Sequence, residues 1–275
     1  MDIKHKNISS QSAHLLAQLH QGNIHCFDIA TAYRLLPGST RDAVKKLLSE
    51  MTKRGLLMRV KEALYFVIPY EQDAESFMPD WHVLAPCLVG KASYYLGYYT
   101  ALQIHGLTTQ PNLREQIVVD TQIKPATIHI KGIPFQFIYH NTSHFFGYRK
   151  IWVDSFNKVQ CSDIEKTLID CLFKPEYGGG ITEITRAIYK SKDSLDYPKL
   201  FEYTRQFQSQ AVMKRLGFLL ELLGIQHSVI EEWQKRISKS FVLLDPSYPK
   251  EGKMISRWAI QQNIDTDSLL SPLDS

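Results

Sequence analysis

Three charged residues in one short stretch have the types and the spacing that could do chemistry: Asp163, Lys166 and Asp170. Positions seven apart on a helix share a face, so Asp163 and Asp170 could form a carboxylate pair for a metal or for acid–base catalysis. A structural explanation is stronger, because Asp163 suits a helix N-terminus and Lys166 can form an ion pair with Asp170 four residues on. We therefore expect a structural role, with Ser162 as N-cap and Glu165 completing its capping box.

Other patterns that could carry catalysis are weaker. Residues 178–180 are three glycines before a predicted helix, but they lack the lysine of a P-loop and the spacing of dinucleotide-binding glycines. His140 and His144 flank a predicted loop, which argues against a zinc site. The four cysteines have no paired spacing, which predicts free thiols in a reducing compartment. We predict no catalytic residue, no metal and no cofactor.

A second set of side chains suits recognition of a polyanion. Between Arg41 and Lys61 the sequence holds seven Lys or Arg residues against two acids. Residues 1–70 hold ten basic and five acidic residues, a surplus of five, so the net charge of +4 leaves −1 for residues 71–275. A basic N-terminal part on a near-neutral body predicts a polyanion-binding module.

The basic stretch also has the pattern of a helix followed by a hairpin. Ser39 suits the N-cap, with Asp42 completing a variant capping box, and Gly55 suits the helix end. Apolar residues follow the spacing of one buried helix face at Val44, Leu47, Leu48 and Met51. Residues 56–60 and 64–68 predict two short strands with a tight turn. Two shorter helices are expected before this stretch, at 11–20 and 26–36.

This order of elements is typical of a winged helix-turn-helix domain that binds double-stranded DNA. The third helix would enter the major groove with its N-terminal end first, so the expected base readers are Thr40, Arg41 and Lys45. The expected phosphate contacts are Lys46, Lys53, Arg54, Arg59 and Lys61, with a further contact at the helix start beside Ser39. The simpler alternative is a basic helix face that only keeps the protein in solution.

The whole chain is expected to be an α+β protein of two domains. We predict a winged helix at 1–70, a polar linker at 71–80 and a C-terminal domain at 81–275, with a mostly antiparallel sheet flanked by helices. Its strands are expected at 116–119, 126–130, 135–139, 151–153, 158–161 and 241–244, and its helices at 94–107, 163–172, 181–189, 197–207, 211–223 and 228–236. The tyrosines of 94–107 are expected in the core, and the tail from Asn263 is expected to be weakly ordered. No signal peptide or membrane span is evident, which predicts a cytoplasmic protein.

Four segments together resemble a known family: Lys53–Pro69, Tyr94–Gln110, Asp163–Ile188 and Lys214–Gly224. They resemble the AbiEi-type antitoxins, also labelled transcriptional regulators, of bacterial abortive-infection (AbiE, type IV) toxin–antitoxin systems. The resemblance implies a winged helix that binds inverted repeats in the promoter of its own operon and represses it. It also implies a C-terminal antitoxin domain that counters a nucleotidyltransferase toxin without a stable complex.

The resemblance extends to particular residues. Asp163, Lys166 and Asp170 match the family's most recognisable C-terminal motif, which makes them the tentative antitoxin motif. Glu62 and Ala63 stand where the family's wing commonly has Gly. Two other functions stay open: a nuclease or nucleotide-processing enzyme with a winged-helix targeting module, and a solitary ligand-responsive regulator.

Overall fold

The computed structural model describes residues 6–271. These residues form two compact units, one up to Leu88 together with Ile130–Gly132, the other from Val89 onward. The predicted linker 71–80 and the helix α4 (Trp81–Leu88) therefore group with the first unit. The Lys61 ammonium donates to the Leu88 carbonyl at 3.1 Å, which fastens the end of α4 to this unit. Both units combine helices with sheets, so the predicted α+β class is confirmed.

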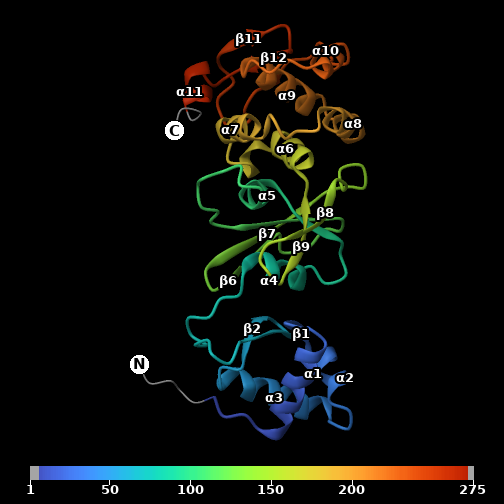
Figure 1. Cartoon of the computed structure of the whole chain (residues 1–275), viewed down its shortest axis with the longest axis vertical. Coiled ribbons are helices and arrows are strands. Elements are labelled where there is room, and N and C mark those ends of the chain that lie inside the picture. The colour runs from blue at the N-terminus through green and yellow to red at the C-terminus, as the bar shows by residue number, and fades with distance from the viewer. Residues whose placement is uncertain (1–5, 272–275) are drawn as a thin grey trace. The chain divides into compact units, whose positions relative to one another are not determined.

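Besides α4, the first unit has three helices packed on a three-stranded antiparallel sheet (Figure 1). The helices are α1 (Ser10–Gln21), α2 (Ile29–Leu35) and α3 (Arg41–Lys53), and the strands, in the order β1-β3-β2, are β1 (Cys26–Asp28), β2 (Leu57–Lys61) and β3 (Leu64–Val67). The predicted helix at 26–36 is wrong in its first three residues. Phe27 pairs with Tyr65 across the sheet, so its side chain gains a buried partner as a strand residue.

Helix α3 buries the four predicted apolar residues, Val44, Leu47, Leu48 and Met51. Its N-cap is Thr40 rather than the predicted Ser39, since the Thr40 hydroxyl accepts a hydrogen bond from the Ala43 amide at 3.2 Å. Ser39 and Thr40 are adjacent hydroxyl residues that carry the same capping signal, so the sequence does not distinguish them. The exposed face of α3 remains the basic one.

The second unit contains a six-stranded sheet in the order β6-β7-β5-β4-β9-β8. The strands are β4 (Tyr94–Leu96), β5 (Glu115–Val119), β6 (Thr127–Ile130), β7 (Ile133–Tyr139), β8 (Tyr148–Trp152) and β9 (Lys158–Ser162). The predicted strand segments are confirmed, and the sheet combines antiparallel with parallel pairs. β5 with β7 and β4 with β9 run parallel, while β4 with β5 and β8 with β9 run antiparallel. Strand direction depends on long connections, which periodicity does not encode.

The predicted helix at 94–107 is instead a strand, β4, followed by a shorter helix, α5 (Tyr98–Ile104). Gly97 separates them, and a Cβ there would lie 2.7 Å from Cγ2 of Val118. Tyr98 then adopts a left-handed backbone with φ of 53°, although it is bulky and fully buried. The chain therefore passes from strand β4 into helix α5 at Gly97, where the close approach of Val118 leaves no room for a side chain.

A layer of helices covers this sheet, and a small three-stranded sheet lies beyond it in the same unit (Figure 1). The helices are α6 (Ile164–Phe173), the 3-10 turn η1 (Pro175–Tyr177), α7 (Ile181–Ser191), α8 (Tyr197–Phe207), α9 (Gln210–Leu222) and α10 (Ser228–Gln234). The small sheet has the order β10-β12-β11, from β10 (Val242–Leu243), β11 (Lys253–Ile255) and β12 (Ile260–Gln262). The predicted weak order from Asn263 is wrong for the described residues, because α11 (Thr266–Leu270) buries Leu269.

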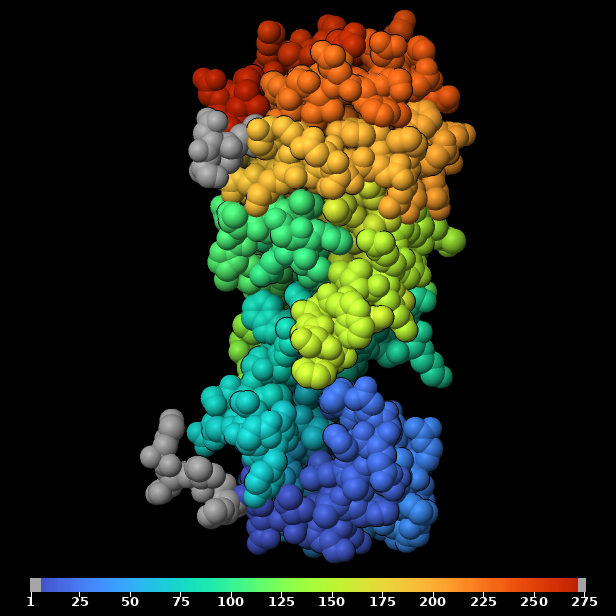
Figure 2. All heavy atoms as spheres, viewed as in Figure 1, coloured from blue at the N-terminus to red at the C-terminus, as the bar shows by residue number. Residues whose placement is uncertain are grey.

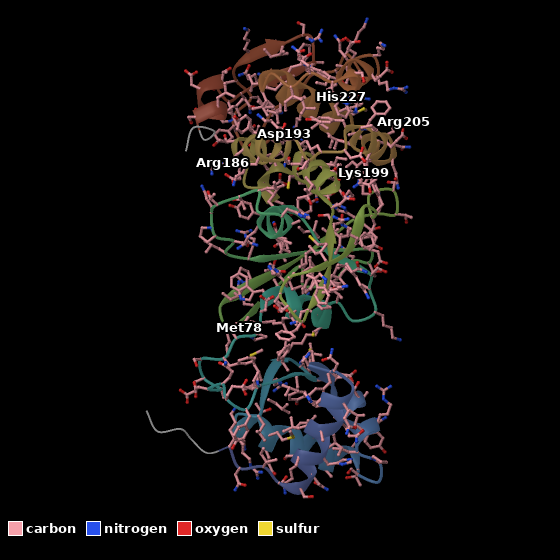
Figure 3. The ribbon with its side chains drawn as sticks, viewed as in Figure 1. Met78, Arg186, Asp193, Lys199, Arg205 and His227 are labelled. Atoms are coloured by element: carbon pink, nitrogen blue, oxygen red, sulfur yellow. The ribbon has the colours of Figure 1, made fainter. Side chains whose placement is uncertain are left out.

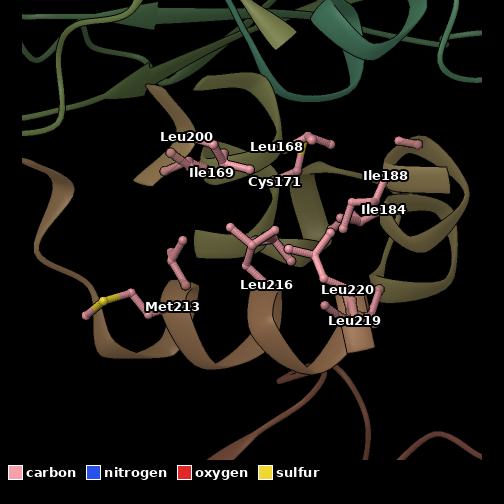
Figure 4. Packing of buried hydrophobic residues seen from close by; sticks show 14 of the residues in the cluster. Leu168, Ile169, Cys171, Ile184, Ile188, Leu200, Met213, Leu216, Leu219 and Leu220 are labelled. Carbon is pink, nitrogen blue, oxygen red and sulfur yellow. The ribbon is translucent and has the colours of Figure 1, made fainter. Parts of the chain in front are cut away.

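The core of the second unit lies between α6, α7 and α9. Leu216, Leu219 and Leu220 of α9 point toward α6 and α7 (Figure 4). On the opposite side of α9, Gly217 contacts Trp258, and a Cβ there would lie 2.1 Å from the indole ring. α6 itself packs against α5, α7 and α9, and this packing positions the charged residues discussed below.

Candidate functional site

A solvent-open groove of about 450 Å³ lies in the first unit between α3 and the β2–β3 hairpin. Its basic side chains are Lys45 and Lys53 from α3 and Arg59 from β2. The remaining lining comes from Ile29, Ser49, Thr52, Glu62, Ala63 and Tyr65. Three cations against one carboxylate make the groove positive, so it suits an anionic group.

The charges of the groove are available to a ligand. Lys45 has a side chain 61% exposed, and its ammonium lies 3.9 Å from the Asp42 carboxylate, itself 96% exposed. Such an exposed pair is worth little energy and exchanges readily for another anion. Lys53 and Arg59 are exposed as well.

The side chains of Arg59 and Lys61, the two basic residues of β2, point in different directions. Arg59 pairs with Tyr65, but the register shifts before Lys61, which pairs with Leu64. Val60 is therefore an extra residue, and such a bulge re-aims the side chain that follows. Arg59 lines the groove, whereas the Lys61 ammonium donates to the Leu88 carbonyl. The sequence placed both residues at one hairpin tip, and only Arg59 faces the groove.

The other predicted DNA contacts lie outside the groove lining. Arg41 lies with its guanidinium carbon 5.9 Å from the Tyr33 ring centre, and Arg54 lies 3.7 Å from the Glu50 carboxylate. Lys46 is exposed on α3, while the Thr40 hydroxyl is engaged as the N-cap beside half-buried Ser39. Arg41 lies at the N-terminal end of α3, which leaves it free to contact a ligand beyond the groove.

The hairpin turn that closes the groove is Glu62–Ala63. Ala63 has a φ of 58°, the left-handed region that glycine occupies more readily. Its carbonyl accepts a hydrogen bond from the Ile29 amide at 3.3 Å, which attaches the turn to the start of α2. Glu62 lines the groove and adds the one negative charge there. Alanine is therefore accommodated at this position, at a cost in backbone strain.

The three candidate residues of the second unit are Asp163, Lys166 and Asp170, which lie at the start of α6 and along it. The N-cap of α6 differs from the prediction. Asp163, not Ser162, is the N-cap and accepts from the Lys166 amide at 2.9 Å. Glu165 does not complete a capping box: its carboxylate lies 2.7 Å from the Lys199 ammonium, which comes from α8 (Figure 3). Asp163 accepts from Lys199 at 2.9 Å and from the Tyr203 hydroxyl at 3.0 Å. These two acids bind α8 to α6.

Lys166 and Asp170 form the predicted ion pair, entirely buried with both side chains 0% exposed. The Lys166 ammonium also donates to the Tyr95 hydroxyl at 2.9 Å, and that hydroxyl donates to the other Asp170 oxygen at 2.9 Å. The rings of Tyr95, Phe146 and Phe207 lie 5.1–5.2 Å from the same ammonium. Burial lowers the pKa of Lys166, and the Asp170 carboxylate opposes that shift.

His140 extends this network. Its Nδ1 lies 3.1 Å from the Tyr95 hydroxyl and its Nε2 lies 2.8 Å from the Tyr98 hydroxyl. Because the single Tyr95 proton goes to Asp170, Nδ1 must carry the imidazole proton, and Nε2 accepts from Tyr98. Burial lowers the pKa of His140 to about 4, so the ring is neutral. Every member of the network has a partner, which is what a buried polar cluster requires.

The paired-carboxylate site is not formed. Asp163 points to α8, whereas Asp170 points to Tyr95 and Lys166 in the core, so the two carboxylates share no ligand position. Sequence reasoning found the Lys166–Asp170 pair but missed Tyr95, Tyr98 and His140. Their separation along the chain carries no local signal, although the burial of the two tyrosines was predicted.

Several other expectations can be compared with the described residues. Within 6–271, no group of three or more His, Cys, Asp or Glu could hold a metal ion. Over the same range, no helix is long and apolar enough to cross a membrane. The four cysteines are free thiols, as predicted. The amide of Ile181, after the three glycines, donates to buried Asp245 at 3.0 Å, so this helix start already holds a carboxylate.

No family model matches the chain, and no curated protein matches it. Among solved structures, the crystal structure of the RV2827C protein from Mycobacterium tuberculosis is similar, with a TM-score of 0.70 at 13% sequence identity. The similarity covers 98% of this chain and 96% of that one. At this identity, the likeness shows a shared fold over nearly the whole length and nothing about ligands.

Proposed function

We propose that this protein is a sequence-specific repressor that binds double-stranded DNA through a winged helix-turn-helix in its first unit. The observation that carries the proposal is the basic groove between α3 and the β2–β3 hairpin. In a winged helix, the recognition helix and the wing both contact the DNA, and the phosphate backbone passes between them. The exposed cations Lys53 and Arg59 line the groove where that backbone would lie, and Lys45 lines it on the side of α3 that faces the bases.

The division of labour on α3 follows from its orientation. Arg41 and Lys45 stand near its N-terminal end, which enters the major groove and reads base edges. Lys53 and Arg59 contact phosphates and set the register of the protein on the duplex. Lys46 and Arg54 add to the positive field, and Lys61 serves the attachment of α4.

The test is a gel-shift titration of the whole chain with DNA from upstream of its own gene, against an unrelated duplex, at two salt concentrations. Affinity for the upstream DNA should fall with salt by about 0.9 log units per log unit for each phosphate contacted. Arg41→Ala and Lys45→Ala should weaken upstream binding selectively, and Lys53→Ala should weaken both duplexes about equally. Lys239→Ala, an exposed lysine of the second unit, is the matched control. Equal affinity for both duplexes would refute the proposal.

The second half of the proposal is that the second unit acts as an antitoxin against a nucleotidyltransferase toxin, as the AbiEi resemblance implies. Asp163, Lys166 and Asp170 contribute by holding α6 against the sheet and α8, since their charged groups are consumed by neighbours. Co-expression with the neighbouring gene product is the test. Survival that depends on the second unit supports the proposal, and a neighbouring gene without toxicity refutes it.

A nuclease or nucleotide-processing enzyme gains no support from this arrangement. Its carboxylates would have to converge on one accessible position, and Asp163 and Asp170 do not. The groove described above belongs to the first unit and does not bear on a solitary ligand-responsive regulator.

A further inference from the structure

The β8–β9 hairpin of the second unit exposes two aromatic side chains. Trp152, at the end of β8, is 60% exposed, and Phe156, in the connecting turn, is 88% exposed. In the same unit Trp233 and Trp258 are buried to within 1%. β8 stands at one end of the strand order, and Figure 2 shows this hairpin, in yellow-green, at the surface. Two large exposed rings on one hairpin form a candidate interaction surface.

The exposure of Phe156 does not come from a frayed turn. Asp154 accepts hydrogen bonds from the amides of Phe156 and Asn157, each at 2.7 Å. Its second oxygen accepts from the Asn157 side chain at 2.8 Å. The turn is therefore ordered in advance, and the Asp154 charge is engaged within it.

The same hairpin is basic on one face. Trp152 pairs with Lys158, and Lys150 pairs with Gln160, so these four side chains share a face of the sheet. The Lys158 ammonium lies 4.2 Å from the centre of the Trp152 ring. Lys150 and Lys158 are both exposed, and the described ion pairs include neither.

We infer that the β8–β9 hairpin binds single-stranded nucleic acid. Unpaired bases stack on the free faces of Trp152 and Phe156, and Lys150 and Lys158 contact the phosphates between them. A duplex does not fit this surface, because its bases already stack on one another. An acidic polypeptide would satisfy the lysines but would leave the two rings without flat partners. This inference stands apart from duplex binding by the first unit.

Fluorescence anisotropy of the whole chain with a labelled oligo(dT) of about 12 nucleotides, a length within known site sizes, provides the test. Trp152→Ala and Phe156→Ala should each weaken binding about 5- to 100-fold. Tyr248→Ala removes a 54% exposed ring from another loop and should leave affinity unchanged. An abasic strand of equal length should bind as weakly as the alanine variants. Bases stacked on Trp152 should also quench the fluorescence of this tryptophan. Trp152→Phe should keep the affinity for oligo(dT) and abolish that quenching.

The two DNA-binding proposals separate by variant. The double variant Lys45→Ala and Arg59→Ala should lose duplex affinity and keep oligo(dT) affinity, and Trp152→Ala should do the reverse. Equal binding of the abasic strand and oligo(dT) would overturn the inference. So would competition by polyglutamate at equal charge, which would assign the hairpin to an acidic protein, or the absence of binding to oligo(dT).

Discussion

Lys45 and Lys166 show how the two units use the same side chain in opposite ways. Lys45 stands on an exposed helix face, 61% exposed and 3.9 Å from the Asp42 carboxylate, which is itself 96% exposed. Lys166 is 0% exposed and satisfied by Asp170, Tyr95 and three aromatic rings. A solvated cation stays available for a ligand, whereas a buried one is consumed by the fold. Lys45 therefore stays accessible on the surface of the first unit, whereas Lys166 is part of the internal structure of the second.

The largest effect on stability is expected from the buried Lys166–Asp170 ion pair. Asp170→Ala leaves the Lys166 ammonium buried without its counter-charge, so we expect a loss of about 3–5 kcal/mol in the unfolding free energy of the second unit. Urea unfolding followed by the fluorescence of Trp233 and Trp258 measures it.

The matched control for Asp170 is Glu50→Ala in the first unit. Glu50 forms an i,i+4 pair with Arg54 at half exposure, so its loss should cost at most about 0.5 kcal/mol. Similar losses for both variants would mean that burial does not separate the two units.

A pH effect of similar size is expected from His140. The pKa of His140 is about 4 in the fold against 6.5 in a free chain, so between these values the unfolded state binds the proton and the native state does not. Stability is therefore fully present above pH 6.5 and is lost as pH falls toward 4, by about 3 kcal/mol.

Urea unfolding of the second unit at pH 7, 5.5 and 4.5 measures this loss. His140→Gln should flatten the pH dependence, while His129→Gln, an exposed histidine on β6, should not. An unchanged slope in His140→Gln would place the titrating group elsewhere.

Arg59 and Lys61 of β2 test whether an exposed cation must face the groove in order to bind DNA. Arg59 faces the groove and Lys61 faces the Leu88 carbonyl. Arg59→Ala should remove a charge-assisted contact worth about 1.5–3 kcal/mol, which weakens duplex affinity about tenfold or more. Lys61→Ala should leave that affinity nearly unchanged and instead loosen α4. Gel shifts measure the first effect and amide hydrogen exchange of α4 the second; equal loss of affinity in both variants would argue that the bulge does not separate them.

The smallest expected effect concerns the strained hairpin turn. Ala63→Gly relieves a left-handed alanine, and we expect the first unit to gain about 0.5–1 kcal/mol after the entropy of the unfolded glycine is offset. Thermal unfolding, followed by a signal that reports on the first unit, measures this gain in stability. Ala74→Gly, in a segment without positive φ, should give no gain, and a loss at Ala63 would show that the turn is unstrained.

Much of the fold followed from local patterns. The buried face of α3 and nearly all the helices of the second unit were predicted, because apolar spacing reports burial directly. Tyr94–Leu96 and Cys26–Asp28 were predicted as helix and are strands, because pairing with distant strands outweighs local propensity. The parallel pairs of the larger sheet were missed for the same reason.

The amino-acid sequence alone established the basic surplus of residues 1–70, the helix and hairpin that carry it, and the i,i+4 spacing of Lys166 and Asp170. Only the tertiary structure decided which charges line the groove and which are buried. A single bulge at Val60 separates Arg59 from Lys61, and the packing of α6 on the sheet encloses Lys166 with Tyr95 and His140. The physical reason is that burial and side-chain direction depend on contacts between segments far apart in the chain, and local spacing does not record them.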